Sequence, residues 1–208
     1  MKEKDIKRFF SALARSWPHR TDCILIGGAV ALLEGGQRPT TDVDFEVKFG
    51  GTRSVNDPDA FASAIRDAES ASGLLGQFTE DFSGWSPVTL PSYRGKKRRW
   101  KSFGPITVWF LDPPDYILTK LRRGAAHDFT DLILVARKKH VSWRSLAMRC
   151  AAAVRSSPKS THLRSFIRRV EYLFRVHGRT IWGKRFDAKS AVDLFQGKSV
   201  RRTLHRKS

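Results

Sequence analysis

The spacing of apolar and polar residues predicts that helices and strands alternate in the first quarter of the chain. The predicted elements are a helix over 5–16, a strand over 22–26, a helix over 27–34 and a strand over 42–47. The second strand alternates strictly, with apolar side chains on one face and Asp42, Asp44 and Glu46 on the other. We therefore expect a strand with one apolar face and one face that carries three carboxylates.

Helical patterns dominate the rest of the chain, with one further strand over 106–111. The predicted helices cover 58–72, 113–123 and 128–139, with others beginning at 142 and 160. Between 74 and 105 the signals are mixed, and short strands are expected on either side of a basic run. The order predicts an α/β protein of the α+β kind, in which a mixed sheet with flanking helices precedes a basic helical region. The expected divisions are a core over 1–140, a basic helical region over 141–197 and a basic tail over 198–208.

Positive charge is concentrated in two places. The 208 residues include 39 Lys and Arg against 20 Asp and Glu, a net charge of +19. Residues 151–208 hold 15 basic and 3 acidic side chains, a net of +12, and six more basic residues lie between Tyr93 and Ser102. Local excesses of this kind are typical of surfaces that bind a polyanion, so a nucleic acid is the expected partner.

Aromatic residues among the cations favour contact with a single-stranded nucleic acid or an unpaired end. The candidate RNA-binding residues are Arg98, Arg99, Trp100 and Lys101 in the basic run and Arg164, Arg168 and Arg175 in the C-terminal region. Two alternatives stay open: the run could be a solvated hairpin, and the C-terminal helices could simply carry a charged outer face.

The apolar stretches and the cysteines indicate in which compartment the protein is located. The longest apolar stretch, residues 23–33, is shorter than the roughly 20 residues that cross a bilayer, and the first residues are charged. Cys23 and Cys150 lie in apolar surroundings, which favours two buried thiols over a disulfide. We expect a cytoplasmic protein with no membrane contact.

A glycine pair and two aspartates carry the clearest chemistry. Gly27 and Gly28 follow a strand and open a helix, where backbone amides can approach phosphate oxygens closely. Asp42 and Asp44 lie two apart on the next strand, so both carboxylates point to one side and can share a hard cation such as Mg²⁺ or Mn²⁺. The expectation is a phosphate site beside a metal site, although a glycine pair before a helix is also a common structural turn.

These residues resemble a known family. Ile26-Gly27-Gly28, thirteen residues and then Asp42-Val43-Asp44-Phe45 resembles the signature of the DNA polymerase beta-type nucleotidyltransferase superfamily. The run from Arg38 to Asp44 is similar to its minimal bacterial branch, which includes toxins of AbiEii type. Later blocks, with Lys120 in one and Asp128 and Asp131 in the other, resemble two helices that follow the core in that branch. The resemblance covers residues 22–137.

The resemblance implies an enzyme that moves a nucleoside monophosphate from an NTP to RNA, with a tRNA end as the expected acceptor and a cognate antitoxin as a further partner. Asp42 and Asp44 would hold the metal, and Gly27 and Gly28 would seat the triphosphate. Lys120 would neutralise phosphate charge, and Asp131 would orient a substrate group. From the residues alone, Asp128 and Asp131 could instead be helix-capping carboxylates.

One position departs from the family pattern. The superfamily places a third carboxylate on a later strand, and that position falls here on Trp109, which cannot bind a metal. Asp112 and Glu46 are the weaker substitutes. The departure motivates one alternative, an RNA-binding or regulatory module that has lost turnover. A separate alternative is an enzyme that nucleotidylates protein.

Overall fold

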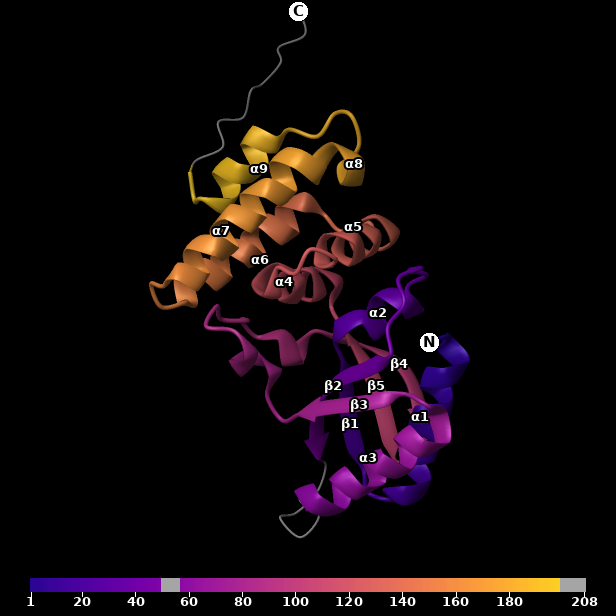
Figure 1. Cartoon of the computed structure of the whole chain (residues 1–208). Coiled ribbons are helices and arrows are strands. Elements are labelled where there is room, and N and C mark those ends of the chain that lie inside the picture. The colour runs from indigo at the N-terminus through magenta and orange to yellow at the C-terminus, as the bar shows by residue number, and fades with distance from the viewer. Residues whose placement is uncertain (50–56, 199–208) are drawn as a thin grey trace, which may run out of the picture.

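In the computed structural model of the protein, residues 1–49 and 57–198 are described, and they form a sheet-containing half and a helical half (Figure 1). The sheet has five strands in the order β3-β2-β1-β5-β4. Their bounds are β1 Thr21–Leu25, β2 Asp42–Phe49, β3 Leu75–Thr79, β4 Lys97–Phe103 and β5 Ile106–Leu111. β1 runs antiparallel to β2 and parallel to β5, so the predicted mixed sheet and α+β class are confirmed.

Two helices cover the apolar face of the sheet. α1 (Glu3–Ser16) and α3 (Pro58–Ser72) pack against each other, and α2 (Gly27–Leu33) follows β1. Phe9 and Phe10 of α1 contact Phe45 of β2 with ring centroids 6.1 and 5.6 Å apart. Val43, Phe45 and Val47 are all buried, as the alternation predicts. The Asp57 side chain caps α3 by accepting from two backbone amides, as its position before Pro58 predicts.

The helical half begins with α4 (Pro113–Arg123). This helix packs against α5 (Asp128–Lys138), α6 (Trp143–Ser156) and α7 (Thr161–Tyr172). The chain then continues through a π-helical stretch, Leu173–His177, into α8 (Gly178–Trp182), and α9 (Ala188–Phe195) follows. One continuous cluster of buried apolar residues runs through both halves, so the core is shared.

The structure differs from the predicted elements in the basic run, in the segment before it and after Trp182. The basic run does not lie between two strands: its residues from Lys97 onward form β4 itself, which makes a hairpin with β5. Phe82–Trp85 and Tyr93–Gly95 are short 3₁₀ turns. α9 was not expected as a separate helix, and most of the predicted tail, residues 199–208, lies outside the described residues.

Other expectations concern the membrane and the thiols. No helix within the described ranges has both the length and the apolar character that crossing a bilayer requires. Cys23 and Cys150 are free and completely buried, as predicted.

Candidate functional site

Gly27 and Asp44 meet at the end of the sheet, whereas Gly28 faces Arg38 and Thr40 and does not line the cavity. The backbone N–H of Ile26 donates to the carbonyl of Asp44 at 2.9 Å, which joins the end of β1 to β2. Gly27 has a φ of +68°, and a Cβ atom there would lie 2.0 Å from Asp44 Oδ2. Only glycine leaves room for this carboxylate, so the expected juxtaposition of Asp44 and the glycine turn is present in the structure.

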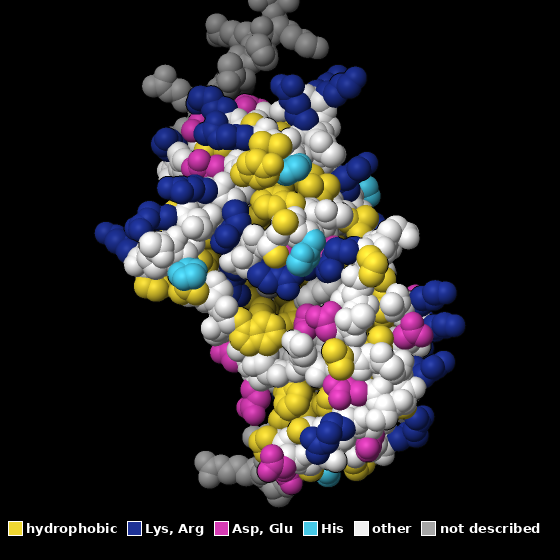
Figure 2. All heavy atoms as spheres, viewed as in Figure 1, with side chains coloured by type: hydrophobic (Ala, Val, Ile, Leu, Met, Phe, Trp, Pro, Cys, Tyr) yellow, Lys and Arg dark blue, Asp and Glu magenta, His cyan; other side chains and the backbone are white. Residues whose placement is uncertain are grey.

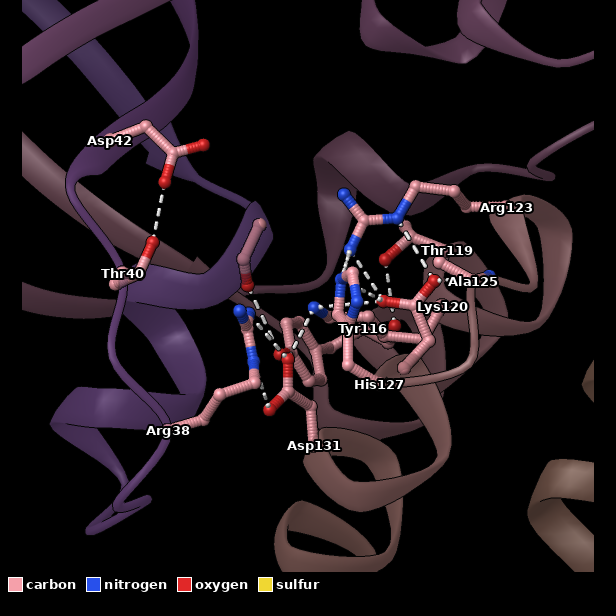
Figure 3. A network of polar contacts seen from close by, with 12 residues as sticks. Arg38, Thr40, Asp42, Tyr116, Thr119, Lys120, Arg123, Ala125, His127 and Asp131 are labelled. Atoms are coloured by element: carbon pink, nitrogen blue, oxygen red, sulfur yellow. Dashed lines mark hydrogen bonds and ion pairs between the residues drawn. The ribbon is translucent and has the colours of Figure 1, made fainter.

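Asp42 lies on the same strand face, two residues before Asp44. Thr40 donates a hydrogen bond to its carboxylate (Figure 3). Burial would raise the pKa of Asp42, but hydrogen bonds from Thr40 and from backbone amides, with the nearby charge of Arg38, hold it below its usual value. Asp42 is therefore ionised at neutral pH.

Asp44 has the opposite shift. Burial raises its pKa from 3.8 to about 6, and the neighbouring charge of Asp42 adds to the effect, while Arg123 and Lys120 oppose it. The positive charges of Arg123 and Lys120 therefore do not fully offset the cost of burying the Asp44 carboxylate in its ionised form. A bound cation would supply the missing compensation, so the pair of carboxylates fits a hard divalent metal.

Lys120 is held by two aspartates of α5. Its ammonium lies 2.7 Å from Asp131 Oδ2 and 3.2 Å from Asp128 Oδ1, and all three side chains are almost completely buried (Figure 3). Lys120 and Asp131, chosen from the sequence, thus lie in direct contact. Asp128 accepts from the backbone N–H of Ala125, but the residue in the N-cap position of α5 is His127.

Three residues without a predicted catalytic role complete this network. Arg38 reaches from the loop before β2 to Asp131 at 3.2 Å. Arg123 donates to Asp128 at 2.9 Å, and the hydroxyl of Tyr116 donates to the carbonyl of Gly27 at 3.1 Å. Tyr116 therefore ties α4 to the glycine turn. The sequence signal for Arg38 was its place within the family-like run, and for Arg123 its place in the last turn of α4.

A cavity of about 360 Å³ lies between the two halves of the molecule. Gly27 and Asp44 contribute from the sheet side, and Lys120, Arg122 and Arg123 contribute from α4. The remaining lining residues include Phe82, Trp85 and His162. Figure 2 shows a hollow on this face, with Lys and Arg side chains above it and hydrophobic and acidic side chains below it. The cavity thus combines carboxylate, cationic and aromatic walls, and its aromatic residues were not identified from the sequence.

Arg122 fixes the aromatic wall. Its guanidinium donates to the carbonyl oxygens of Ser83 and Ser86 and is only 6% exposed. Burial lowers its pKa to about 10, so it remains a cation at neutral pH. In the described part of the chain, its Nε atom has no hydrogen-bond partner. Arg122 therefore holds the 3₁₀ turn that carries Phe82 and Trp85, and it brings positive charge to the cavity.

Across the described strands, the side chains in register with Trp109 include one carboxylate, Glu46, and it is already hydrogen-bonded. Trp109 pairs with Ile24, which pairs with Glu46, so all three side chains share the sheet face of Asp44. The ammonium of Lys97 lies 4.4 Å from the centroid of the indole. Trp109 therefore occupies the carboxylate face of the sheet, under a cation.

The two substitute ligands are engaged elsewhere. Glu46 accepts from Arg94 at 2.8 Å, from the Tyr93 hydroxyl and from the backbone N–H of Phe82 at 3.1 Å. Asp112 occupies the N-cap position of α4, where burial and the charge of Asp115 raise its pKa. Neither belongs to the cavity lining drawn from the described residues, and neither does Asp42; of these carboxylates, Asp44 alone does.

Across residues 1–49 and 57–198, no group of three or more His, Cys, Asp or Glu side chains is arranged to hold a metal. The remaining candidate set is the pair Asp42 and Asp44. Such a set is compatible with Mg²⁺, which is commonly held by one or two carboxylates and completes its coordination with water and substrate phosphates.

The basic run lies apart from the cavity lining and is partly paired. Arg98 contacts Glu34 at 3.0 Å, and Arg99 donates to the hydroxyl of Ser102. Trp100 is half-buried against Phe103 and Phe110, so its ring helps to cover the core. Lys101 is exposed. The backbone of the run is one strand of the hairpin β4–β5, and its contact with RNA stays a prediction.

The three arginines chosen in the C-terminal region have free access to solvent. Arg164 and Arg168 lie on α7 and Arg175 lies in the π-helical stretch, and all three are exposed.

Comparisons with protein-family models, with curated proteins and with solved structures find no match to this chain.

Proposed function

We propose that the protein is a metal-dependent nucleotidyltransferase that moves a nucleoside monophosphate from an NTP to a hydroxyl of RNA, with a tRNA end as the acceptor. The cavity carries this proposal. It brings the Asp44 carboxylate and Gly27 to one wall and three cationic side chains to the other. An NTP needs both walls, because its phosphates must meet positive charge and its α-phosphate must lie near the metal-binding carboxylates.

Each residue group has a defined part in this proposal. Asp42 and Asp44 would hold Mg²⁺ or Mn²⁺, which when bound would neutralise phosphate charge and favour departure of pyrophosphate. Lys120 and Arg123 neutralise the triphosphate from α4. Asp131 is a positioning residue, because its carboxylate holds Lys120 in the cavity wall. Phe82 and Trp85 offer an apolar surface for the nucleobase.

The proposed reaction forms one bond and breaks one. An RNA hydroxyl oxygen attacks the α-phosphorus, the bond from that phosphorus to the bridging oxygen of the β-phosphate breaks, and pyrophosphate leaves. The hydroxyl proton passes to water. The strongly basic C-terminal region supports a polyanionic acceptor and disfavours a cationic small molecule.

A second candidate is an RNA-binding module with the same fold and no turnover. It is favoured by Trp109 in the row of Glu46, where the resemblance implies a third carboxylate, and by the engagement of Glu46 with Arg94 and Tyr93. Such a module would bind RNA with strong salt dependence and transfer nothing.

The biological setting follows from the same proposal. Action on tRNA requires a cytoplasmic location, and the likeness to the toxin branch implies growth arrest that a cognate antitoxin relieves. Induced expression of the wild type in a bacterial host, compared with Asp44→Asn, tests this setting. Equal growth of the two cultures would contradict it.

The biochemical test is transfer of label from each α-³²P-labelled NTP to total tRNA in the presence of Mg²⁺. Asp44→Asn should reduce transfer about 100-fold or more, the order expected when one group that stabilises transition-state charge is removed. Asp22→Asn is the matched control, because Asp22 lies on the same sheet but outside the cavity lining. RNA binding without label favours the module, and label on protein favours protein nucleotidylation.

A further inference from the structure

Three aromatic side chains from separate turns gather at the surface of the helical half. Phe129 of α5, Tyr172 at the end of α7 and His177 at the end of the π-helical stretch form what we term the aromatic triad. Their ring centroids are 5.4 Å apart for Phe129 and Tyr172, 5.6 Å for Phe129 and His177, and 5.3 Å for Tyr172 and His177. Tyr172 is 48% exposed, so part of the triad faces solvent.

The π-helical stretch accounts for the third member. In an α-helix, positions five apart point in different directions, whereas the i→i+5 hydrogen bonds of a π-helix bring them close to one face. The wider turn over Leu173–His177 therefore sets His177 beside Tyr172. Stretches of this kind are rare and are frequently found at functional sites.

Cations surround the exposed ring. Arg168 and Arg175 are exposed and lie about one turn before and after Tyr172. Glu171 is directed elsewhere, because its carboxylate accepts a hydrogen bond from the side chain of Gln196 at 2.7 Å. The surface around Tyr172 thus combines an aromatic face with positive charge, a combination that suits a nucleic-acid strand.

The triad is connected to the cationic wall of the cavity through the two helices that carry it. Arg169, three residues before Tyr172, donates to the carbonyl of Arg122 at 3.0 Å. Phe129 directly follows Asp128, which holds Arg123. The same two helices, α5 and α7, therefore carry the triad and contact the cavity residues of α4.

We propose that the aromatic triad is the platform on which an unpaired base of the RNA acceptor stacks, while Arg168 and Arg175 hold the flanking phosphates. The inference rests on the proposed function and names where its acceptor docks. A nucleic acid is favoured over a protein partner because residues 151–208 carry a net charge of +12.

The test is the affinity for a fluorescent single-stranded RNA of roughly twelve nucleotides, measured by anisotropy over a series of salt concentrations. Tyr172→Ala should weaken binding about tenfold and leave the salt dependence unchanged, because stacking is lost and no charge changes. Tyr172→Phe should bind within about twofold of the wild type, since the ring remains. Arg168→Gln with Arg175→Gln should lower the slope of log affinity against log salt by about 1.4, the value expected for two phosphate contacts on a single strand.

Leu75→Ala is the matched control, because Leu75 is 57% exposed but lies on the edge strand β3 of the sheet. It should bind RNA as the wild type does. Unchanged affinity in Tyr172→Ala, or a wild type that binds no RNA at low salt, would overturn the platform; the second result would leave a protein as the partner of this surface.

Failure of the platform and failure of the proposed function give different results. RNA binding that depends on Tyr172, without transfer of label by the wild type, would support the platform and refute the enzyme. Transfer of label to RNA by the wild type, with equal RNA affinity in Tyr172→Ala, would support the enzyme and refute the platform.

Discussion

Replacing Asp44 with asparagine should stabilise the folded protein at neutral pH, although it removes the central carboxylate of the candidate site. The folded state raises the pKa of Asp44 from 3.8 to about 6, mainly through burial and then through Asp42. Each pKa unit corresponds to about 1.36 kcal/mol, so the ionised group costs the folded state about 3 kcal/mol at pH 7. Asparagine keeps the shape of the side chain and removes this cost.

The sign of the pH dependence follows from the direction of the shift. Because the folded protein binds the proton more readily than the unfolded chain, Asp44 ceases to destabilise the fold as pH falls from about 6 toward 4. The advantage of Asp44→Asn should therefore be largest at pH 7, up to about 3 kcal/mol, and should fall below about 1 kcal/mol at pH 4.

Urea unfolding of both proteins in EDTA, at intervals between pH 4 and pH 7, measures this difference. Asp22→Asn supplies a control of opposite sign, because the pKa of Asp22 is held below its usual value by Lys97 despite partial burial. Addition of Mg²⁺ should stabilise the wild type and leave Asp44→Asn unchanged. An Asp44→Asn protein that is less stable than the wild type at pH 7 would refute the reasoning.

Further predictions concern three residues around the cavity. Gly27→Ala should cost at least about 2 kcal/mol more than Gly73→Ala in urea unfolding, because both glycines have a positive φ but only the first lacks room for a Cβ atom; equal losses would contradict the clash. Lys120→Met should cost about 3 kcal/mol, since it removes a buried cation that two buried aspartates share and leaves them only the more exposed Arg38 and Arg123, whereas Lys7→Met at an exposed pair should cost at most about 1 kcal/mol. Arg122→Met should speed amide hydrogen exchange in residues 82–86 and weaken NTP binding, because the carbonyls that it holds lose their donor; unchanged exchange would show that the turn is held otherwise.

Local signals made much of the fold predictable. Asp57 before Pro58 and Gly73 after Ser72 bound α3 as expected, because a side-chain cap and a glycine with φ of +72° act within one turn of the chain. The alternation over Asp42–Val47 likewise predicted which side chains share each face of β2, since it depends only on the two-residue period of a strand. It did not predict that Asp44 and Glu46 on the polar face are buried as well, because that burial comes from tertiary contacts. The basic run was harder, because its residues pack by tertiary contact: Trp100 covers the core in a strand that also carries exposed cations.

In the candidate site, too, the contacts between neighbouring elements could be predicted and those between distant residues could not. Gly27 and Asp44 could be paired from their places in two adjacent elements, and Lys120 and Asp131 from a family-like spacing. Arg38 could not be assigned, because its contact with Asp131 joins residues 93 positions apart. The aromatic wall depends on a turn held by Arg122 from a distant helix, and no sequence pattern reports such a contact.

The most direct test of nucleotidyl transfer compares two labels in one NTP. With Mg²⁺, tRNA and the wild-type protein, label from the α-phosphate should appear on RNA, and pyrophosphate should be released in equal amount. Label from the γ-phosphate should stay off the RNA. Asp44→Asn should reduce both the transfer of α-phosphate label and the release of pyrophosphate about 100-fold or more. Label from the γ-phosphate on RNA, or RNA binding with no release of pyrophosphate, would contradict the account.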